Sequence, residues 1–353
     1  MIVFDRKEFE ETAREVFTTH SPSGYTGDIT ALLKRRVEEM GYACRVHNKG
    51  TLEVVIPGAD ESRTVATSAH ADTLGLMVRS VKAGGTLAVT NVGGPQLPTL
   101  DGEYCTVVTR DGRRYSGTIL SQAPASHVFP DAKTMPRDLD HMEVRLDEIV
   151  HNEDDVKALG IQNGDFVLID PKFTVTPSGF LKSRFIDDKA SVVILLMLLR
   201  WCAENKVTFR HTTRVYFVVY EEVGHGASAV AEDIDEFVTV DMGCIGLDLA
   251  GSEYAVSICA KDSGGPYDYE LTSRLIALAK EHGVAHTVDI FPFYGSDIGA
   301  ALGAGRDLKG ALIGTGVAAS HGMERTHIQG IEATLQLLYL YLCQDEKGEE
   351  GEK

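Results

Sequence analysis

The sequence predicts an α/β fold in which a mixed central sheet carries helices on both faces and a small β domain is inserted into the chain. Apolar strand-type segments alternate with helical segments at both ends of the 353-residue chain. Between them, residues 74–173 contain short β-type segments and glycine turns without a long helical period. We therefore expect an α/β domain formed by residues 1–73 and 174–345, with 74–173 as a separate small β domain.

Size and composition are those of a globular protein. Hydrophobic residues make up 43% and charged residues 24% of the chain, and no apolar stretch has the length of a membrane span. The longest apolar stretch, residues 190–199, is expected to be a buried helix. The first residues lack the charged, apolar and small-residue regions of a signal peptide. We therefore expect a cytoplasmic location and no membrane partner.

The acidic charge narrows the choice of partners. A formal net charge of −18 argues against nucleic acid, because phosphate binding requires clustered lysine and arginine. The acids favour a solvated surface, and part of their charge can be balanced by bound divalent metal. The six cysteines are scattered without CxxC spacing, so we expect reduced thiols and neither a disulfide framework nor a zinc knuckle.

The first 60 residues predict two helices and a hairpin. Residues 5–18 and 25–40 have helical periodicity. Strands are expected at 43–47 and 51–56, joined by a short turn that contains Gly50.

The next strand ends in a candidate metal ligand. A run of small and β-branched residues, 64–69, leads to His70-Ala71-Asp72 and then to glycine. The Asp72 side chain lies on the same side of an extended chain as His70 and can accept its second imidazole N–H. That arrangement orients a histidine that binds metal. A lone histidine is more often a core or surface residue, so this motif needs partners elsewhere in the chain.

The inserted segment has a sequence pattern that differs from that of the α/β segments. Short β-type stretches at 86–90, 104–109, 115–119 and 166–169 alternate with glycine turns. The segment contains no dense cluster of ligand-type residues, so we assign no site to it.

The second half of the chain repeats one pattern, an apolar strand followed by an acid or a histidine near glycine. The residues that follow its strands in this way are Glu221 with Glu222, Asp241, Asp297 and His321. Asp187 and Asp188 precede the apolar helix expected at 190–204. Capping and the helix dipole account for acids at that position, but an acid there also lies at the bottom of a buried crevice.

The remaining elements follow from periodicity. Helices are expected at 225–234, 268–282 and 328–343. The charged tail, 346–353, is expected to be disordered.

These strand ends combine into a candidate two-metal site. In an open α/β sheet, ligands bind at the carboxyl ends of the strands. Two histidines and several carboxylates without cysteine form the ligand set of a di-metal hydrolase. Such a site needs one carboxylate between the cations and a free one that takes a proton from water. Glu221 and Glu222 suit that division, because consecutive side chains of an extended segment diverge.

The motifs also resemble those of a known family. They are SAHADTLG (68–75), RFIDDKAS (184–191), YEEVGHGAS (220–228), VDMG (240–243), YGSD (294–297), SHG (320–322) and LGIQNGDFVLID (159–170). Their order and spacing are similar to those of the tetrahedral, glutamyl and deblocking aminopeptidase family of di-metal exopeptidases. The resemblance covers nearly the whole chain. It implies a di-zinc exopeptidase-like domain and a metal-dependent aminopeptidase that removes N-terminal residues from short peptides.

The resemblance implies a role for each candidate residue. The metal ligands would be His70, Asp187, Glu222, Asp241 and His321. Asp187 would bridge two divalent ions per subunit, which are usually zinc or cobalt in this family. Glu221 would be the general base, and Asp72 would orient His70.

The same resemblance implies an assembly. The inserted domain would dimerise the subunits, and the homo-oligomer would range from a dimer to a hollow tetrahedral dodecamer. Two segments depart from the family pattern: only His225 separates Gly224 from Gly226, where the family has Leu-Arg, and the residues on both sides of His321 differ. The metal ligands are all present, so these departures concern the substrate side of the site.

Other functions remain open at this point. A deacylase or carboxypeptidase on the same scaffold would use the same ligands. A glycosidase with Glu221 and Glu222 as its acid pair has poor geometry, because adjacent strand residues point to opposite faces. A non-catalytic assembly protein would not need the complete ligand set. Lys261, Arg306 and Arg325 are candidates to receive an acidic N-terminal side chain, with surface solvation as the other interpretation.

Overall fold

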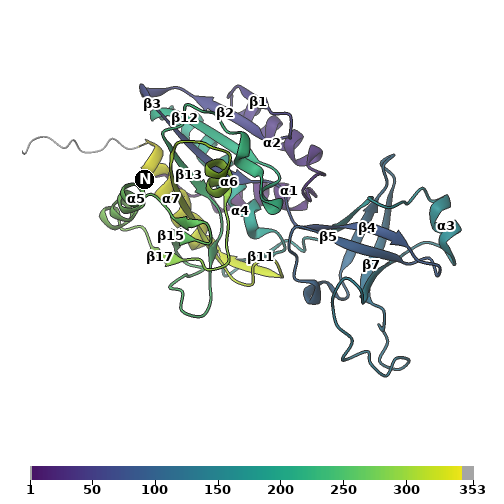
Figure 1. The fold of residues 1–353 in the computed structure, drawn as a ribbon. Coiled ribbons are helices and arrows are strands. Elements are labelled where there is room, and N and C mark those ends of the chain that lie inside the picture. Colours follow the sequence, from purple (N-terminus) through teal and green to yellow (C-terminus); the bar gives the residue numbers. More distant parts are fainter. Residues whose placement is uncertain (1, 344–353) are drawn as a thin grey trace, which may run out of the picture.

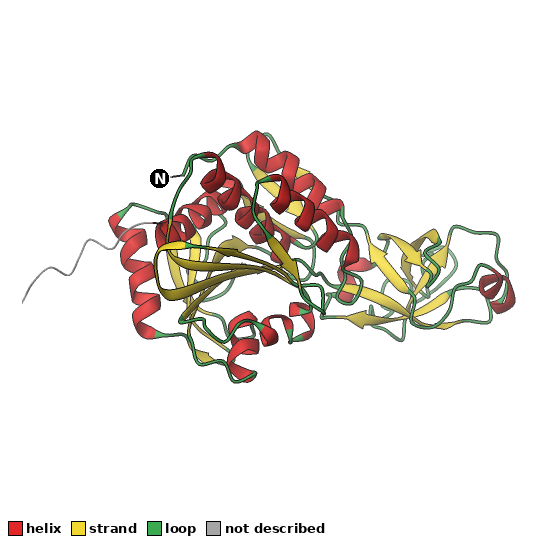
Figure 2. Ribbon diagram, turned by 90° about the horizontal axis from the view of Figure 1, so that it is seen from above, coloured by secondary structure: helices red, strands yellow, loops and turns green. Residues whose placement is uncertain are grey.

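The computed structural model describes residues 2–343, which form a large α/β body with a smaller β body projecting from one side (Figure 1). The expected disordered tail, 346–353, lies outside the described residues. The larger body contains a mixed sheet with helices on both faces, as Figure 2 shows from above. The predicted fold class is confirmed.

Seven α-helices lie within residues 2–343. They are α1 (Arg6–Thr18), α2 (Gly27–Glu39), α3 (Glu153–Ala158), α4 (Ile186–Glu204), α5 (Tyr269–Glu281), α6 (Asp297–Gly303) and α7 (Ile328–Cys343). Asp5 and Asp268 begin α1 and α5 by accepting backbone N–H groups three residues on. None of these described helices has both the length and the apolar character needed to cross a bilayer.

The main sheet has ten strands. They are β1 (Cys44–Val46), β2 (Leu52–Ile56), β3 (Gly58–His70), β12 (Phe209–Val218), β13 (Glu236–Val240), β14 (Gly243–Cys244), β15 (Val256–Asp262), β16 (Gly265–Pro266), β17 (His286–Ile290) and β18 (Lys309–Val317). Strands β12, β3, β13 and β18 are neighbours and run parallel. Their carboxyl ends therefore meet at one edge of the sheet, which is where ligands bind in open α/β sheets.

Alternate residues of the central strands pack into two cores. Val215 and Phe217 of β12 join the core that contains α1, α2, α4, α5 and α7. Tyr216 and Val218 point the other way, into a core that includes Ile298 of α6. This period of two is what a strand buried on both faces requires, and it explains why the last part of β12, residues 215–218, is apolar without a break.

The smaller body is a closed barrel. Its strands, in barrel order, are β4 (Gly75–Val81), β5 (Leu87–Val92), β8 (Met142–Leu146), β7 (Arg114–Ser121), β6 (Tyr104–Val108) and β9 (Phe166–Ile169). The apolar barrel interior also receives Phe185 from the segment just before α4. All six strands lie inside 74–173, the range expected for an inserted β domain, and the exact domain limits stay a prediction.

A small three-stranded sheet connects the chain's return from the barrel to its last helix. Its strands are β10 (Thr174–Val175), β11 (Phe180–Ser183) and β19 (Glu324–His327), with β11 in the centre. In this pairing Ser183 lies opposite Glu324. The residues before α4 are thereby brought beside the loop that carries His321.

Two local structures differ from the expectation. Helix α4 begins at Ile186, and Asp187 and Asp188 within its first turn have non-helical backbone angles. The expected helix over 225–234 is absent, and that range contains only a short 3₁₀ turn, η3 (Gly226–Ala229), which follows another 3₁₀ turn, η2 (Glu221–Val223). Gly224 between them has φ of +84°, a left-handed conformation that favours glycine. A third 3₁₀ turn, η1 (Leu97–Leu100), follows β5.

Candidate metal centre

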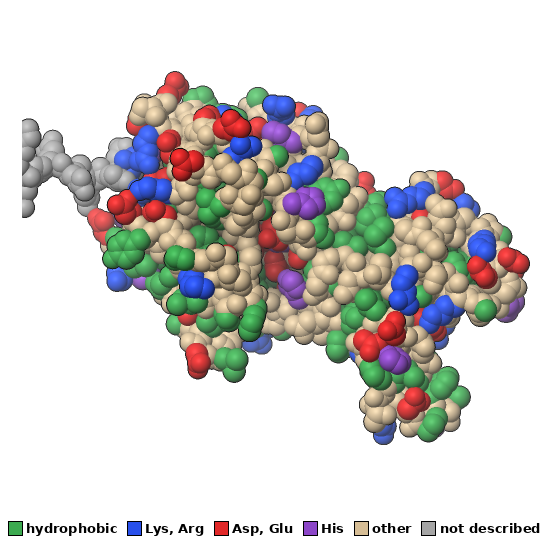
Figure 3. All heavy atoms as spheres, viewed as in Figure 1, with side chains coloured by type: hydrophobic (Ala, Val, Ile, Leu, Met, Phe, Trp, Pro, Cys, Tyr) green, Lys and Arg blue, Asp and Glu red, His purple; other side chains and the backbone are tan. Residues whose placement is uncertain are grey.

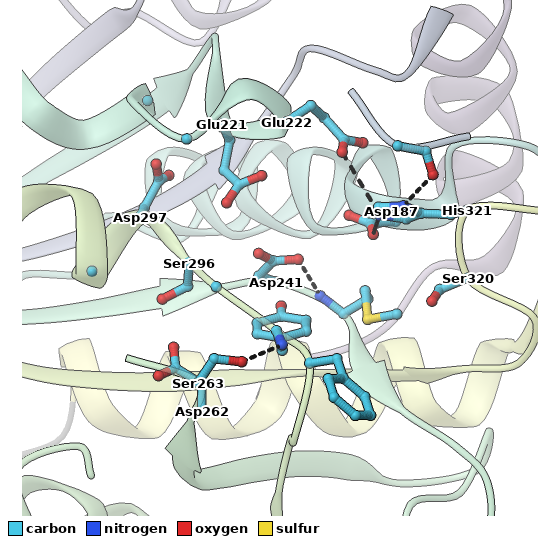
Figure 4. Close-up of a pocket in the computed structure, with 18 of the residues that line it drawn as sticks. Asp187, Glu221, Glu222, Asp241, Asp262, Ser263, Ser296, Asp297, Ser320 and His321 are labelled. Atoms are coloured by element: carbon cyan, nitrogen blue, oxygen red, sulfur yellow. Dashed lines mark hydrogen bonds and ion pairs between the residues drawn. The ribbon is translucent and has the colours of Figure 1, made fainter. Parts of the chain in front are cut away.

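The strand ends predicted to carry ligands surround one cavity of about 870 Å³. Acidic side chains lie at the bottom of a hollow near the middle of the molecule (Figure 3). Figure 4 shows how the labelled side chains converge. Of the seven predicted site residues, those that line the cavity are Asp187, Glu221, Glu222, Asp241 and His321. The structure thus brings these five together, and His70 and Asp72 lie buried directly behind them.

Asp187 lies between the two predicted histidine ligands. His70 Nε2 is 3.0 Å from Asp187 Oδ1, and His321 Nε2 is 3.5 Å from Asp187 Oδ2. The second nitrogen of each ring is held by a backbone carbonyl, that of Asp72 for His70 and that of Gly94 for His321, each at 3.0 Å. Both rings therefore present Nε2 to the same carboxylate, which suits a carboxylate that bridges two cations.

Asp241 and Glu222 extend the cluster on its two sides. One ligand atom each of His70, Asp187 and Glu222 lie within 4.8 Å of one another, and so do those of His70, Asp188 and Asp241. Glu222 Oε2 is 3.7 Å from His321 Nε2. The described residues therefore form two overlapping groups with the spacing of metal ligands.

Asp72 differs from its expected contact. Its carboxylate is 3.7 Å from His70 Nδ1, too far for a hydrogen bond, and its backbone carbonyl accepts that N–H instead. The carboxylate accepts the Ser23 hydroxyl and the backbone N–H groups of Glu221 (3.1 Å) and Glu222 (3.4 Å). Asp72 thus fixes the turn that aims the glutamate pair, and it orients His70 only through its main chain.

The electrostatics of the cluster show a shortage of positive charge. Burial raises the pKa of Glu221 and Glu222 well above the ordinary value, and burial raises the pKa of Asp241 to about 7. At Asp187 burial acts in the same direction, but hydrogen bonds from His321 and His70 outweigh it and lower the pKa. The hydrogen bond to Asp187 raises the pKa of His321 to about 9. Two imidazoles are too few cations for this many buried carboxylates.

Divalent cations fit the cluster. Glu222 Oε1 and Asp188 Oδ1 are buried and have no hydrogen-bond partner in the described structure. Leaving such an oxygen unpaired costs on the order of 1–3 kcal/mol, and more when it is charged. Imidazole with carboxylate oxygen is a donor set suited to zinc and related ions. The residues present therefore match the metal that the motifs imply.

Glu324 is a functional residue that the sequence did not reveal. Its buried carboxylate accepts the backbone N–H of His321 (2.8 Å) through Oε1 and that of Asp187 (3.0 Å) through Oε2. One side chain thus positions two predicted ligands that are 134 residues apart in the chain. A glutamate in a short edge strand carries no sign of this role, because the role depends on the pairing of β11 with β19.

Arg184 is the second such residue, and it joins three segments. Its guanidinium donates to Glu103 (2.9 Å) and to the Thr99 carbonyl (2.7 Å) of the inserted segment, and to the Gly322 carbonyl (3.3 Å) beside His321. Gln96 of the inserted segment also donates its backbone N–H to the His321 carbonyl at 3.0 Å. The inserted segment therefore holds the His321 loop.

The chain is similar to aminopeptidases over most of its length. A family model for the M42 glutamyl aminopeptidases matches residues 50–337. The putative aminopeptidase YhfE of Bacillus subtilis is 41% identical over 333 residues, which are 94% of this chain and 96% of that protein. A glutamyl aminopeptidase of Lactococcus lactis is 24% identical over 66% of each chain. A solved structure with a similar fold is that of the Pyrococcus horikoshii TET1 peptidase, with a TM-score of 0.83 at 21% identity. The match covers 96% of this chain and 100% of that chain. That peptidase is described as able to assemble into a tetrahedron or a large octahedral shell.

Proposed function

The chain belongs to the M42 glutamyl aminopeptidase family, as its motifs predicted, and it is an aminopeptidase; on this basis we propose that it removes N-terminal residues from short peptides with two divalent metal ions per subunit. The observation that carries the two-metal proposal is the position of Asp187 between His70 and His321. A carboxylate with one imidazole near each oxygen is the arrangement that a two-ion site needs.

The family resemblance assigns the ligands, and the residues that it pairs lie close together in this structure. His70 and Asp241 would hold one ion and Glu222 and His321 the other, with Asp187 between them. Bound there, zinc or cobalt would lower the pKa of water and polarise the scissile carbonyl group. Asp188 is close enough to Asp241 and His70 to compete as a ligand, but its Oδ2 accepts the His70 backbone N–H at 3.0 Å. Its role in the proposal is to position His70.

Glu221 is the general base in this proposal. Its Oε2 lies 3.7 Å from His70 Nε2, at the edge of the ligand cluster, and its carboxylate lines the cavity. Burial raises the pKa of Glu221, and a raised pKa suits a carboxylate that accepts and then releases a proton. Glu221 would take a proton from the attacking water and deliver it to the leaving amine, so that the peptide bond breaks as the new carboxyl group forms.

The barrel is proposed to mediate homo-oligomerisation, from a dimer up to a dodecamer. The TET1 peptidase, which has a similar fold, is described as able to assemble into a tetrahedron or a large octahedral shell. In this chain the barrel projects from the α/β body, and its segment exposes apolar side chains such as Tyr104 (66%), Val128 (72%) and Ile149 (91%). The proposal requires these side chains to lie in one contact surface, because contiguous apolar patches mark protein interfaces.

The test is a hydrolysis assay with metal-stripped protein. A panel of aminoacyl p-nitroanilides would be offered without metal and with zinc, cobalt or manganese, and N-acetylated versions of each would serve as controls. Metal-restored cleavage of the free-amine substrates alone supports the proposal. Cleavage of acetylated substrates, or none under any metal while the ions remain bound, would point to a sister hydrolase such as a deacylase or carboxypeptidase.

A further inference from the structure

The cavity extends beyond the predicted metal ligands along a second wall. This wall comes from the ends of β15 and β17 and from the start of α6, opposite His321 (Figure 4). Its side chains include Asp262, Ser263, Phe293, Tyr294 and Asp297. A peptide whose scissile bond lies at the metal ligands would place its first side chain against a wall of this kind.

The charge of the cavity is negative even when two divalent ions are included. Its carboxylates are Asp187, Glu221, Glu222, Asp241, Asp262 and Asp297. Two divalent ions would balance four of these six charges, so the acids outside the proposed ligand and base set, Asp262 and Asp297, remain. No lysine or arginine is found among the lining residues in the part of the chain that the structure describes.

The two arginines considered as partners for an acidic substrate lie elsewhere. Arg306 pairs with Glu232 at 2.8 Å, and Arg325 pairs with both oxygens of Glu253 at 2.7 and 2.9 Å. Neither lines the cavity. Each already has a carboxylate partner, so neither is placed to receive an acidic side chain.

Two lysines close to the cavity do not line it. Lys261 donates its Nζ to the Asp262 carbonyl at 2.8 Å, outside the cavity lining. Lys49 donates to the Gly226 carbonyl at 3.1 Å and to Ser228 at 3.0 Å, and it lines a separate cavity of about 130 Å³. Lys49 also interacts electrostatically with Asp297. The Asp262 carboxylate accepts hydrogen bonds from two neutral donors, Gly264 and Tyr267, so it is the acid of this wall that is left for a ligand cation.

Asp262 is held in place as a fixed acceptor. It is 5% exposed, and its Oδ1 accepts the Gly264 backbone N–H at 2.7 Å while Oδ2 accepts the Tyr267 hydroxyl at 2.8 Å. Each carboxylate oxygen has a second lone pair, which a ligand cation can use. Preorganised acceptors of this kind lose little entropy when they bind.

Apolar surface lies beside this acid. Phe293 is 98% exposed, and Met242 and Tyr294 also line the cavity. A lysine or arginine side chain carries an aliphatic stem that packs on apolar groups and a charged end that needs an acceptor. In this cavity the apolar side chains would contact the stem, and the Asp262 carboxylate would accept hydrogen bonds from the charged end.

We propose that this enzyme prefers peptides whose N-terminal side chain is basic and rejects those that begin with glutamate or aspartate, with Asp262 as the determinant of that choice. The inference rests on the proposed function for the position of the scissile bond. It adds the substrate class, which the family name does not fix for this chain.

The first experiment compares kcat/KM for lysyl, arginyl, leucyl, alanyl and glutamyl p-nitroanilides with the metal-loaded enzyme. We expect lysyl and arginyl substrates to exceed the glutamyl substrate by at least about 100-fold, because like charges placed together are strongly disfavoured. A glutamyl preference, or equal rates for lysyl and glutamyl substrates, overturns the proposal.

Asp262→Asn with Asp307→Asn as its matched control isolates the determinant. Asparagine can still accept from Gly264 and hydrogen bond with Tyr267, so the fold is retained. Asp307 is exposed and does not line the cavity, so its variant changes the net charge by the same amount. We expect only Asp262→Asn to lower the lysyl-to-leucyl ratio, by about tenfold or more and mainly through KM. An unchanged ratio, or the same decrease in Asp307→Asn, contradicts the proposal.

A binding measurement tests the proposed charge preference independently of catalysis. Calorimetry with lysinamide and with the α-amide of glutamic acid, carried out in the Glu221→Gln background so that neither amide is hydrolysed, measures charge selectivity without turnover. Tighter lysinamide binding that weakens in Asp262→Asn supports the inference even if no peptide is cleaved, in which case only the proposed function fails. Tighter binding of the glutamic acid amide, or binding of neither ligand, overturns the inference.

Discussion

The carboxyl edge of the main sheet and the junction with the barrel both bury acids, but these acids differ in their partners within the chain. At the junction, buried Glu103 accepts a hydrogen bond from the Arg184 guanidinium and forms an ion pair with Lys172. At the sheet edge, Glu222 Oε1 and Asp188 Oδ1 have no partner. Glu103 therefore has its counterion within the chain, whereas the sheet edge depends on a cation from outside. This contrast, more than the number of acids, distinguishes a metal centre from a structural ion pair.

The largest expected effect concerns catalysis at the sheet edge. Glu221→Gln should lower kcat by about 10³-fold, because general acid–base groups contribute on the order of 10²–10⁴. Metal content, measured by elemental analysis, should not change, since Glu221 is outside the proposed ligand set. The exposed Glu61→Gln is the control and should retain full activity. A Glu221→Gln enzyme that is active, or that has lost an ion, would refute the assignment.

The next prediction tests the paired acid at the junction. Arg184→Met should lower the free energy of unfolding by up to about 3–5 kcal/mol, because it leaves buried Glu103 with only the partly exposed Lys172 as its counterion. Urea unfolding followed by circular dichroism measures this. The control is Arg325→Met, whose ion pair with Glu253 is more exposed and should cost at most about 1 kcal/mol. Equal losses in the two variants would show that burial of the pair at the junction does not matter.

Metal addition tests the unpaired acids directly. Zinc or cobalt at 100 times Kd should stabilise the stripped protein by about 2.7 kcal/mol per site, since the ion binds only the folded chain. Thermal unfolding with and without metal measures the gain, and a chelator should reverse it. Glu222→Gln should weaken the effect. If the stripped protein unfolds at the same temperature with and without metal, the sheet edge does not need an external cation.

The smallest effect on stability is expected on the barrel surface. Ile149→Ser, at a side chain that is 91% exposed, should change the free energy of unfolding by less than about 0.5 kcal/mol. Together with Tyr104→Ser it should nevertheless shift the assembly toward smaller species in sedimentation velocity runs. An oligomer of unchanged size would place the interface outside these two residues.

The sequence was informative wherever one segment carried the whole signal. The helix expected at 328–343 has those limits in α7, and the helix expected at 268–282 is α5 within one residue at each end. The acid or histidine after each central strand lies at the sheet edge because parallel strands bring their carboxyl ends together. The candidate ligands could therefore be chosen from strand periodicity and short motifs.

The sequence was uninformative where a role depends on contacts between distant segments. Glu324 acts on His321 and Asp187 only because β19 pairs with β11, and nothing near residue 324 indicates that pairing. Asp72 was expected to bind the His70 ring through its carboxylate. The chain turns after His70, so that the Asp72 carbonyl takes the ring N–H and its carboxylate reaches the glutamate turn.

The contacts that the inserted segment makes with the His321 loop determine whether the barrel can be removed from this chain. Gly94 and Gln96 bind His321, and Thr99 and Glu103 bind Arg184, which holds the next residue of that loop. Excising the barrel from the gene would remove these four partners together. A chain without the insertion would need other contacts to orient the same histidine. The barrel segment is therefore a structural part of the metal centre, and replacing it is expected to require new partners for this loop.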